Sequence, residues 1–167
     1  MRDAEYFTQG PLSSLYVTGG TYNPRMTYPM RVLVADDDRD AVESLMELLR
    51  DEGYEVRGVY TGLDVLDKVR DFSPDVVLLD IGMPHISGYE AARALRERYG
   101  SARPQLIAVT GRAGANDRNL AQLAGFDHHV AKPYDPNELL ALLKPIGGAT
   151  RSPEARGTPC PGALPDR

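Results

Sequence analysis

The chain has 167 residues, which suits one domain and leaves little for a second. Its formal net charge of -5 at pH 7 argues against nonspecific binding to nucleic acid, because such binding requires a basic surface. A single cysteine, Cys160, excludes an intramolecular disulfide, and no stretch approaches the ~20 consecutive apolar residues of a membrane span. We therefore expect a cytoplasmic protein that makes no direct contact with nucleic acid or with a membrane.

Three segments of the chain differ in composition. Residues 1–29 carry scattered Tyr, Thr, Gly and Pro without a helical or strand period, which predicts a flexible N-terminal extension. Residues 147–167 are rich in Gly, Pro, Ala and Arg, which predicts a disordered C-terminal tail. The intervening residues 30–146 have the size of one α/β domain.

Within this domain, short apolar runs alternate with amphipathic segments. The runs cover residues 32–35, 54–60, 76–79, 106–109 and 128–131. The first, third and fourth runs are apolar without alternation, as strands covered on both faces should be. Five strand-and-helix units predict a parallel sheet with helices on both faces, although the alternation does not give the strand order.

The expected helices are marked by residues that favour helix ends. Capping boxes are indicated by the spacing of Thr61 with Asp64 and of Ser87 with Glu90. Asp38 and Asp135 are interpreted as acids at helix starts, and helix ends are expected at Gly53, Gly100 and Gly125.

Polar side chains follow four of the five predicted strands. Asp36, Asp37 and Asp38 come after the first strand, Asp80 after the third, Thr110 after the fourth and Lys132 after the fifth. The carboxyl ends of parallel strands meet at one edge of the sheet, and such folds bind ligands in the crevice beyond that edge. We therefore expect these side chains to form one site.

The charges at this edge predict a metal-assisted phosphoryl transfer. Asp36, Asp37 and Asp80 would repel one another unless a cation joined them, and Mg²⁺ prefers carboxylate and phosphate oxygens. A carboxylate beside a phosphate donor can act as a nucleophile and form an acyl phosphate. Lys132 and the metal would neutralise the charge that develops, while Thr110 could donate a hydrogen bond to the transferred group.

The segments RVLVADDD, VVLLDIGMP, LIAVTG and HHVAKP resemble, in order, the four signature segments of the response-regulator receiver family. This resemblance implies a flavodoxin-like, doubly wound (βα)5 fold whose five parallel strands have the order 2-1-3-4-5. It also implies a role for each candidate residue. Asp80 is the phosphoacceptor, and Asp36, Asp37 and the backbone carbonyl of Gly82 are metal ligands together with Asp80. Lys132 contacts the phosphate, and Thr110 provides the switch hydroxyl.

The resemblance further implies how such a protein works. A sensor histidine kinase or a histidine phosphotransfer protein donates the phosphoryl group in the presence of Mg²⁺. The chain is then a switch that catalyses its own phosphorylation, with autodephosphorylation as an additional activity, rather than an enzyme. After phosphorylation, the surface formed by the fourth helix, the fifth strand and the fifth helix changes its shape or dynamics. The protein is expected to be a monomer or a weak dimer that forms through that surface. The segments GYEAARALR and AGFDHHVAKP resemble receivers of hybrid histidine kinases or single-domain regulators.

One position departs from the receiver pattern, and two others leave the lifetime of the acyl phosphate open. Where receivers usually carry Tyr or Phe, three residues before the lysine, this chain has His129, which is either a switch residue or a packed edge-strand histidine. Gly82 and Arg112 occupy positions that tune acyl-phosphate lifetime in the family, and they predict opposite effects.

Two other functions are compatible with parts of the pattern. Asp36 and Asp38 have the spacing of the acids in small Mg²⁺-dependent phosphohydrolases of the haloacid-dehalogenase type, in which Asp36 would be the nucleophile. The residues that should follow those acids in such a hydrolase are absent. The second alternative is a receiver that works as an unphosphorylated scaffold.

Overall fold

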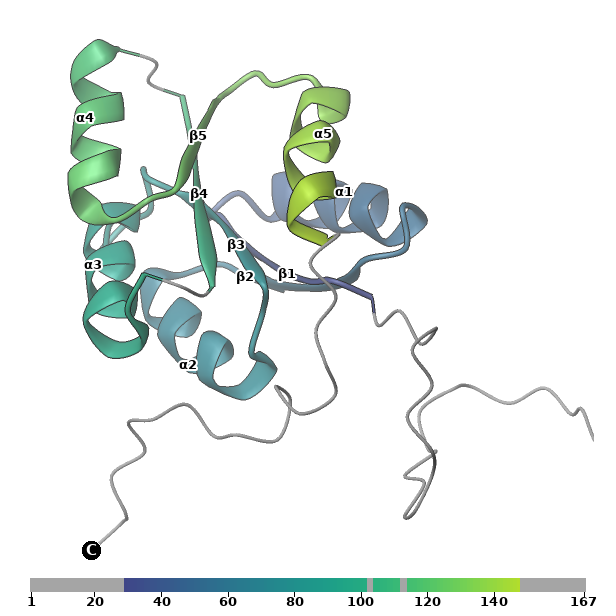
Figure 1. The fold of residues 1–167 in the computed structure, drawn as a ribbon, viewed down its shortest axis with the longest axis horizontal. Coiled ribbons are helices and arrows are strands. Elements are labelled where there is room, and N and C mark those ends of the chain that lie inside the picture. Colours follow the sequence, from purple (N-terminus) through teal and green to yellow (C-terminus); the bar gives the residue numbers. More distant parts are fainter. Residues whose placement is uncertain (1–28, 102–103, 112–113, 148–167) are drawn as a thin grey trace, which may run out of the picture.

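The computed structural model describes residues 29–101, 104–111 and 114–147. The predicted N-terminal extension and C-terminal tail lie outside the described residues, apart from residues 29 and 147. The strands are β1 (Arg31–Ala35), β2 (Glu55–Val59), β3 (Val76–Asp80), β4 (Gln105–Thr110) and β5 (His128–Ala131). The helices are α1 (Arg39–Asp51), α2 (Gly62–Phe72), α3 (Gly88–Tyr99), α4 (Ala115–Ala124) and α5 (Pro136–Gly147). Figure 1 shows strand and helix alternating along the chain, as predicted.

The five strands form one sheet in the order β2-β1-β3-β4-β5. Each of the four pairings is parallel, and β3 lies at the centre between β1 and β4. This arrangement confirms the fold class and the strand order that the family resemblance implied. All carboxyl ends of the strands therefore meet at one edge.

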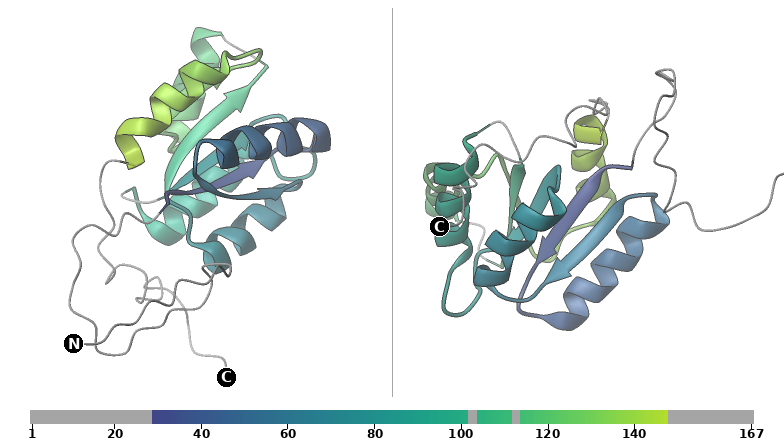
Figure 2. Two further views of the ribbon diagram at one scale, coloured as in Figure 1. Left: turned by 90° about the vertical axis from the view of Figure 1, so that its right-hand side faces the viewer. Right: turned by 90° about the horizontal axis from the view of Figure 1, so that it is seen from below.

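Helices cover both faces of the sheet. Helices α1 and α5 lie on one face and α2, α3 and α4 on the other, and the two turned views show the same layers (Figures 1 and 2). Successive strand residues alternate between the layers, because side chains of a strand point to opposite faces. On β3, Val77 and Leu79 pack with the α2–α4 layer, while Val76 and Leu78 pack with α1 and α5. This two-sided burial explains why the central strands are apolar without alternation.

The predicted helix starts are present. Ser87 and Glu90 form a complete capping box at α3, and the Thr61 hydroxyl accepts a hydrogen bond from the Asp64 amide at α2. Asp38 caps α1 by accepting hydrogen bonds from the amides of Asp40 and Ala41. These local signals therefore fix the residues at which α1, α2 and α3 begin, next to the carboxyl ends of the strands.

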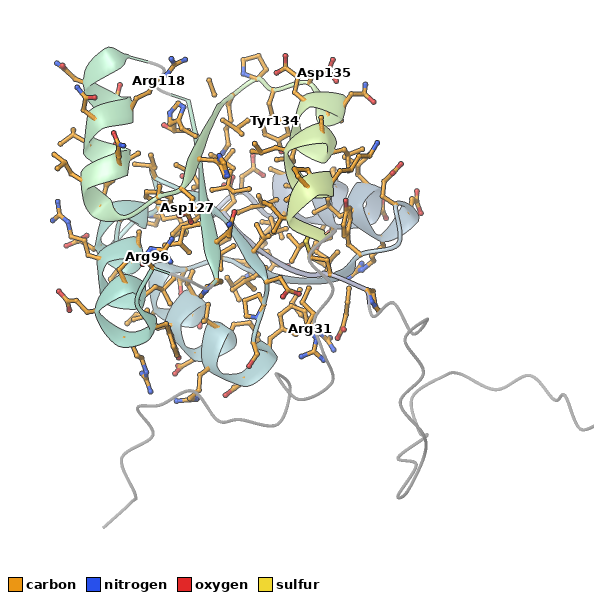
Figure 3. All side chains as sticks on the ribbon, viewed as in Figure 1. Arg31, Arg96, Arg118, Asp127, Tyr134 and Asp135 are labelled. Carbon is orange, nitrogen blue, oxygen red and sulfur yellow. The ribbon has the colours of Figure 1, made fainter. Side chains whose placement is uncertain are left out.

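Arginines tie elements together at the opposite edge of the sheet. The Arg96 guanidinium, on α3, pairs with Asp127, just before β5, with 2.6 Å between nitrogen and oxygen. Arg31 on β1 pairs with Glu55 on β2 at 3.0 Å. Figure 3 shows the Arg96–Asp127 pair and Arg31 among all described side chains. Within the described residues, every helix is too short or too polar to cross a membrane.

Candidate functional site

Two buried carboxylates lie side by side at the carboxyl end of the sheet. Asp36 directly follows β1, and Asp80 is the last residue of β3. Because Ala35 pairs with Leu79 in the parallel register, the next residues along the two strands become neighbours. Asp36 and Asp80 each have only 7% of their surface exposed. The sheet register thus places two acids where water can screen their repulsion only weakly.

A third acid completes the group. Asp37 is exposed, and its carboxylate, with those of Asp36 and Asp80, offers ligand atoms that all lie within 4.8 Å of one another. The group consists entirely of hard oxygen donors, which divalent cations such as Mg²⁺ prefer. The predicted carboxylates are therefore together, and they can hold a metal ion.

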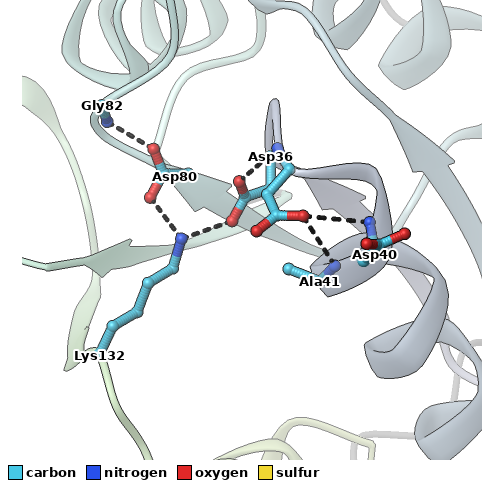
Figure 4. Close-up of polar contacts among 7 residues, drawn as sticks. Asp36, Asp40, Ala41, Asp80, Gly82 and Lys132 are labelled. Carbon is cyan, nitrogen blue, oxygen red and sulfur yellow. Dashed lines mark hydrogen bonds and ion pairs between the residues drawn. The ribbon is translucent and has the colours of Figure 1, made fainter.

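Lys132 bridges the two buried acids (Figure 4). Its ammonium donates to Asp36 Oδ2 at 2.5 Å and to Asp80 Oδ1 at 2.8 Å. The second Asp80 oxygen accepts a hydrogen bond from the Gly82 amide at 2.6 Å. Both oxygens of Asp80 therefore have defined partners. The Gly82 contact is made by its N–H, and metal ligation by its carbonyl remains a prediction.

Backbone contacts hold Asp36 and Lys132 in place. Asp36 Oδ1 accepts a hydrogen bond from the Asp38 amide at 3.0 Å, and the Asp36 amide donates to the Val59 carbonyl of β2 at 3.3 Å. The Lys132 amide donates to the Thr110 carbonyl at 2.7 Å, which joins the ends of β4 and β5. The bridging lysine is therefore fixed through the same sheet that positions the acids.

Thr110 ends β4 and is buried, with 4% of its surface exposed. Asp80 pairs with Val109 in the register, so Thr110 lies one residue beyond the level of Asp80. The structure thus places Thr110 at the same edge as the acids. Its switch role stays a prediction.

Burial determines the electrostatics of the site. Desolvation raises the pKa of the Asp80 carboxyl; the hydrogen bond and charge of Lys132 offset this only in part, and the Asp36 carboxylate raises the pKa further. Burial lowers the pKa of Lys132, but its hydrogen bonds to Asp36 and Asp80 outweigh burial and raise the pKa above its ordinary value. The group thus has three carboxylates and one ammonium, which contacts two of them, and a bound divalent cation would relieve this imbalance of charge.

Asp38 does not take part in the acid group. Its side chain caps α1, and the group of close ligand atoms is formed by Asp36, Asp37 and Asp80. A haloacid-dehalogenase-type site would require Asp38 beside Asp36. The local geometry therefore does not support that use of the two acids.

The three histidines have different surroundings. His85 and His128 are exposed, and His85 has a positive φ of 67° in the loop after β3. His129 is half-buried, and its Nε2 atom is buried without a hydrogen-bond partner among the described residues. Arg112 lies outside the described residues, so its predicted effect on acyl-phosphate lifetime stays a prediction.

Sequence reasoning missed one residue next to the site. Gly88 is the first residue of α3 and lies against the Asp80 backbone. Glycine is a poor helix former, so a glycine directly after the capping Ser87 was the available signal of close packing. The signal does not identify the neighbour, because only the tertiary structure brings Asp80 there.

Comparison with known proteins gives one consistent result. The chain matches the family model of the response regulator receiver domain over residues 32–144. It is 37% identical over 131 residues to the response regulator MprA of Mycobacterium sp. strain KMS, covering 78% of this chain and 56% of MprA. The chain thus spans about half the length of such curated relatives.

Solved structures give the same picture. A CheY-like receiver domain protein from Methanospirillum hungatei is similar with a TM-score of 0.65 and 30% identity, over 72% of this chain and 95% of that one. The receiver domain of the sensor histidine kinase PA1611 from Pseudomonas aeruginosa has a TM-score of 0.66 and 28% identity, over 73% of this chain and 100% of that one. The PA1611 structure contains a magnesium ion coordinated in its active site cleft.

Proposed function

The chain belongs to the response regulator receiver family of two-component systems, and on this basis we propose that Asp80 is its phosphoacceptor. The observation that carries the proposal is the environment of the Asp80 carboxylate. It ends the central strand, it is 7% exposed, and the Lys132 ammonium lies 2.8 Å from its Oδ1. A phosphohistidine of a sensor histidine kinase or of a histidine phosphotransfer protein would be the donor, and the two would meet in the cytoplasm.

The side chains divide the chemistry among them. A carboxylate oxygen of Asp80 forms a bond to phosphorus as the bond from phosphorus to the donor imidazole nitrogen breaks, and the donor histidine, already protonated at its other ring nitrogen, leaves as neutral imidazole. Lys132 keeps its proton, since its pKa is raised, and its ammonium can move from the acids to the oxygens of the transferred group. Thr110 would donate a hydrogen bond to the same group.

Asp36, Asp37 and Asp80, with the carbonyl of Gly82, would hold Mg²⁺. When bound, the ion supplies neutralisation of the charge on the phosphoryl oxygens. The donor set supports this assignment, since three carboxylates converge within 4.8 Å. The magnesium ion in the similar PA1611 receiver supports it further.

His129 serves as the switch partner of Thr110 in this proposal. Its buried Nε2 has no hydrogen-bond partner among the described residues, and leaving such a group unpaired costs about 1–3 kcal/mol. A ring rotation that gives Nε2 a partner after phosphorylation would recover that cost and change the α4–β5–α5 surface. Leu120 and Leu123 of α4 are exposed on the molecule and offer apolar contact area for a binding partner or for a weak dimer.

The proposal is tested by incubating the full chain with phosphoramidate and Mg²⁺ and measuring the intact mass. We expect one hydroxylamine-labile phosphoryl adduct, which is lost in Asp80→Asn and in the presence of EDTA. Asp38→Asn is the matched control, because asparagine caps a helix as well as aspartate does and should leave the adduct intact.

Other results would point elsewhere. An adduct that survives Asp80→Asn contradicts the assignment of the phosphoacceptor. Absence of any adduct in the folded chain would favour an unphosphorylated scaffold. Repeated turnover of a phosphomonoester that depends on both Asp36 and Asp38 would favour a hydrolase. The lifetime of the adduct measures autodephosphorylation directly.

A further inference from the structure

The start of α3 lies against the backbone of Asp80, although the whole β3–α3 loop, residues 81–87, separates them in sequence. The Gly88 amide donates a hydrogen bond to the Ile81 carbonyl, with 3.2 Å between nitrogen and oxygen. The loop therefore brings the first residue of the helix back to the end of the central strand.

Position 88 has no room for a side chain. A Cβ atom there would lie 2.3 Å from the Asp80 carbonyl oxygen, 2.8 Å from Ile81 Cα and 3.0 Å from the Asp80 carbonyl carbon. Separations under 3.0 Å are essentially never seen for real Cβ atoms, so a side chain would force these groups apart. Gly88 does not have a positive φ, so the close approach itself requires the glycine.

The strand side of this contact is held firmly. Leu79 pairs with Ala35 of β1, Asp80 pairs with Val109 of β4, and the Ile81 amide donates to the Val109 carbonyl at 3.2 Å. A shift of the Asp80 backbone would therefore disturb the pairing of the central strand.

The helix side is also held. Ala91, Ala92 and Leu95 of α3 are all 0% exposed in the core, and the Ser87–Glu90 capping box fixes the first turn. Close-packed interiors resist such displacement. A side chain at position 88 would consequently move both the helix and the strand end, and not one of them alone.

The Asp80 carboxylate cannot absorb such a shift without losing its partners. Its Oδ1 lies 2.8 Å from the Lys132 ammonium and its Oδ2 lies 2.6 Å from the Gly82 amide. We propose that Gly88 is a positioning residue for phosphoryl transfer: without a side chain, it lets the start of α3 hold the Asp80 backbone where the carboxylate meets Lys132 and the acid pair. This inference rests on the proposed role of Asp80.

The test compares Gly88→Ala with Gly58→Ala in the full chain. Gly58 of β2 is also crowded, since a Cβ atom there would lie 2.5 Å from Met46 Sδ and 2.6 Å from Val42 Cγ1, but these are side-chain atoms away from the site. Three quantities are measured for each folded protein: the thermal midpoint, the Mg²⁺ affinity by calorimetry without a phosphodonor, and the rate of adduct formation with phosphoramidate at saturating Mg²⁺.

We expect Gly88→Ala to slow adduct formation at saturating Mg²⁺ by about tenfold or more and to weaken Mg²⁺ binding, because a small misplacement of a reacting group is costly in rate. Gly58→Ala should lower the thermal midpoint and leave the rate per folded molecule within about twofold, since the reacting groups keep their geometry. A purely structural role for Gly88 would lower the midpoint in the same way without changing rate or affinity.

A folded Gly88→Ala protein with the wild-type rate and Mg²⁺ affinity would overturn the inference. If Gly88→Ala does not fold, Ser87→Ala decides, because it loosens the first turn of α3 without adding atoms. A reduced rate in folded Ser87→Ala, with the rate kept in the matched helix-cap variant Thr61→Ala, supports the inference, and an unchanged rate overturns it. If Asp80→Asn loses the adduct while Gly88→Ala keeps the wild-type adduct rate and Mg²⁺ affinity, this inference alone is refuted and the proposed function stands.

Discussion

Lys132 joins two carboxylates that end different strands. Its ammonium lies 2.5 Å from Asp36 and 2.8 Å from Asp80, so it occupies one oxygen of each acid. A divalent cation in the same acid group would compete with Lys132 for these oxygens. Lys132 therefore has two opposing effects in the proposed reaction. It competes with the metal for the acid oxygens before transfer, and it stabilises the charge of the phosphoryl group during and after transfer.

This competition predicts opposite changes in Lys132→Ala. Without the ammonium, the repulsion among Asp36, Asp37 and Asp80 increases, so we expect tighter Mg²⁺ binding in a calorimetric titration. Adduct formation from phosphoramidate should nevertheless fall by about a hundredfold, because the cation that stabilises the transferred charge is missing. Lys144→Ala, an exposed lysine of α5, is the control and should change neither quantity. Weaker Mg²⁺ binding in Lys132→Ala would show that Lys132 organises the acids instead of competing with the metal.

At the scale of elements, Arg96 connects the end of α3 to the segment between α4 and β5. Its guanidinium donates to the Gly125 carbonyl at 2.7 Å, to the Pro104 carbonyl at 2.9 Å and to Asp127 Oδ2 at 2.6 Å. The same Asp127 oxygen accepts a hydrogen bond from the Leu106 amide of β4 at 2.8 Å. Arg96 thus fixes the amino ends of β4 and β5, opposite the proposed site.

Removing this connection should destabilise the fold without affecting the chemistry. The Arg96 side chain is only 14% exposed, and Arg96→Ala should lower the free energy of unfolding by about 2–3 kcal/mol, since it leaves carbonyl groups and Asp127 without their partner. Urea unfolding provides the measurement. Arg70→Ala is the control, because Arg70 pairs with Asp67 and Asp71 on the exposed surface of α2 and should leave the urea midpoint unchanged. Equal effects of the two substitutions would contradict this account.

At the scale of the whole molecule, two apolar layers stabilise one central sheet. The buried residues of the layer under α1 and α5 run in sequence from Met30 to Leu143. The buried residues of the layer under α2, α3 and α4 all fall between these two positions. Both layers are thus built from the predicted receiver segment, residues 30–146. The central strands contribute to both layers at once, which fixes the carboxyl edge where the acids meet.

This distribution predicts that residues 29–147 fold independently. Deleting residues 1–28 and 148–167 should change the free energy of unfolding by no more than about 0.5 kcal/mol and preserve the Asp80 adduct. Urea unfolding and intact mass after phosphoramidate treatment are the measurements. A shorter chain of residues 29–138 should fail to fold, because it lacks Leu139, Leu140 and Leu143 of the core. A large loss of stability in the 29–147 chain would show that the outer segments contribute to the core.

The sequence alone predicted the helices and strands and the residues that meet at the carboxyl edge of the sheet. Uninterrupted apolar runs required strands covered on both faces, and the residues that follow those runs named Asp36, Asp37, Asp80, Thr110 and Lys132. These features depend on local pattern and on the rule that parallel strands end at one edge, so they need no coordinates. The strand order came from family resemblance, because local pattern carries no information on which strands are neighbours.

Only the tertiary structure decided which contacts the site residues make. It showed that Lys132 bridges Asp36 and Asp80, that the close acid group consists of Asp36, Asp37 and Asp80 without Asp38, and that Gly88 lies against the Asp80 backbone. The Lys132 ammonium lies 2.5 Å and 2.8 Å from acids that follow two other strands, and the Gly88 contact spans the whole β3–α3 loop. Such distances are set by sheet register and by helix packing, and neither is encoded in the spacing of residues along the chain.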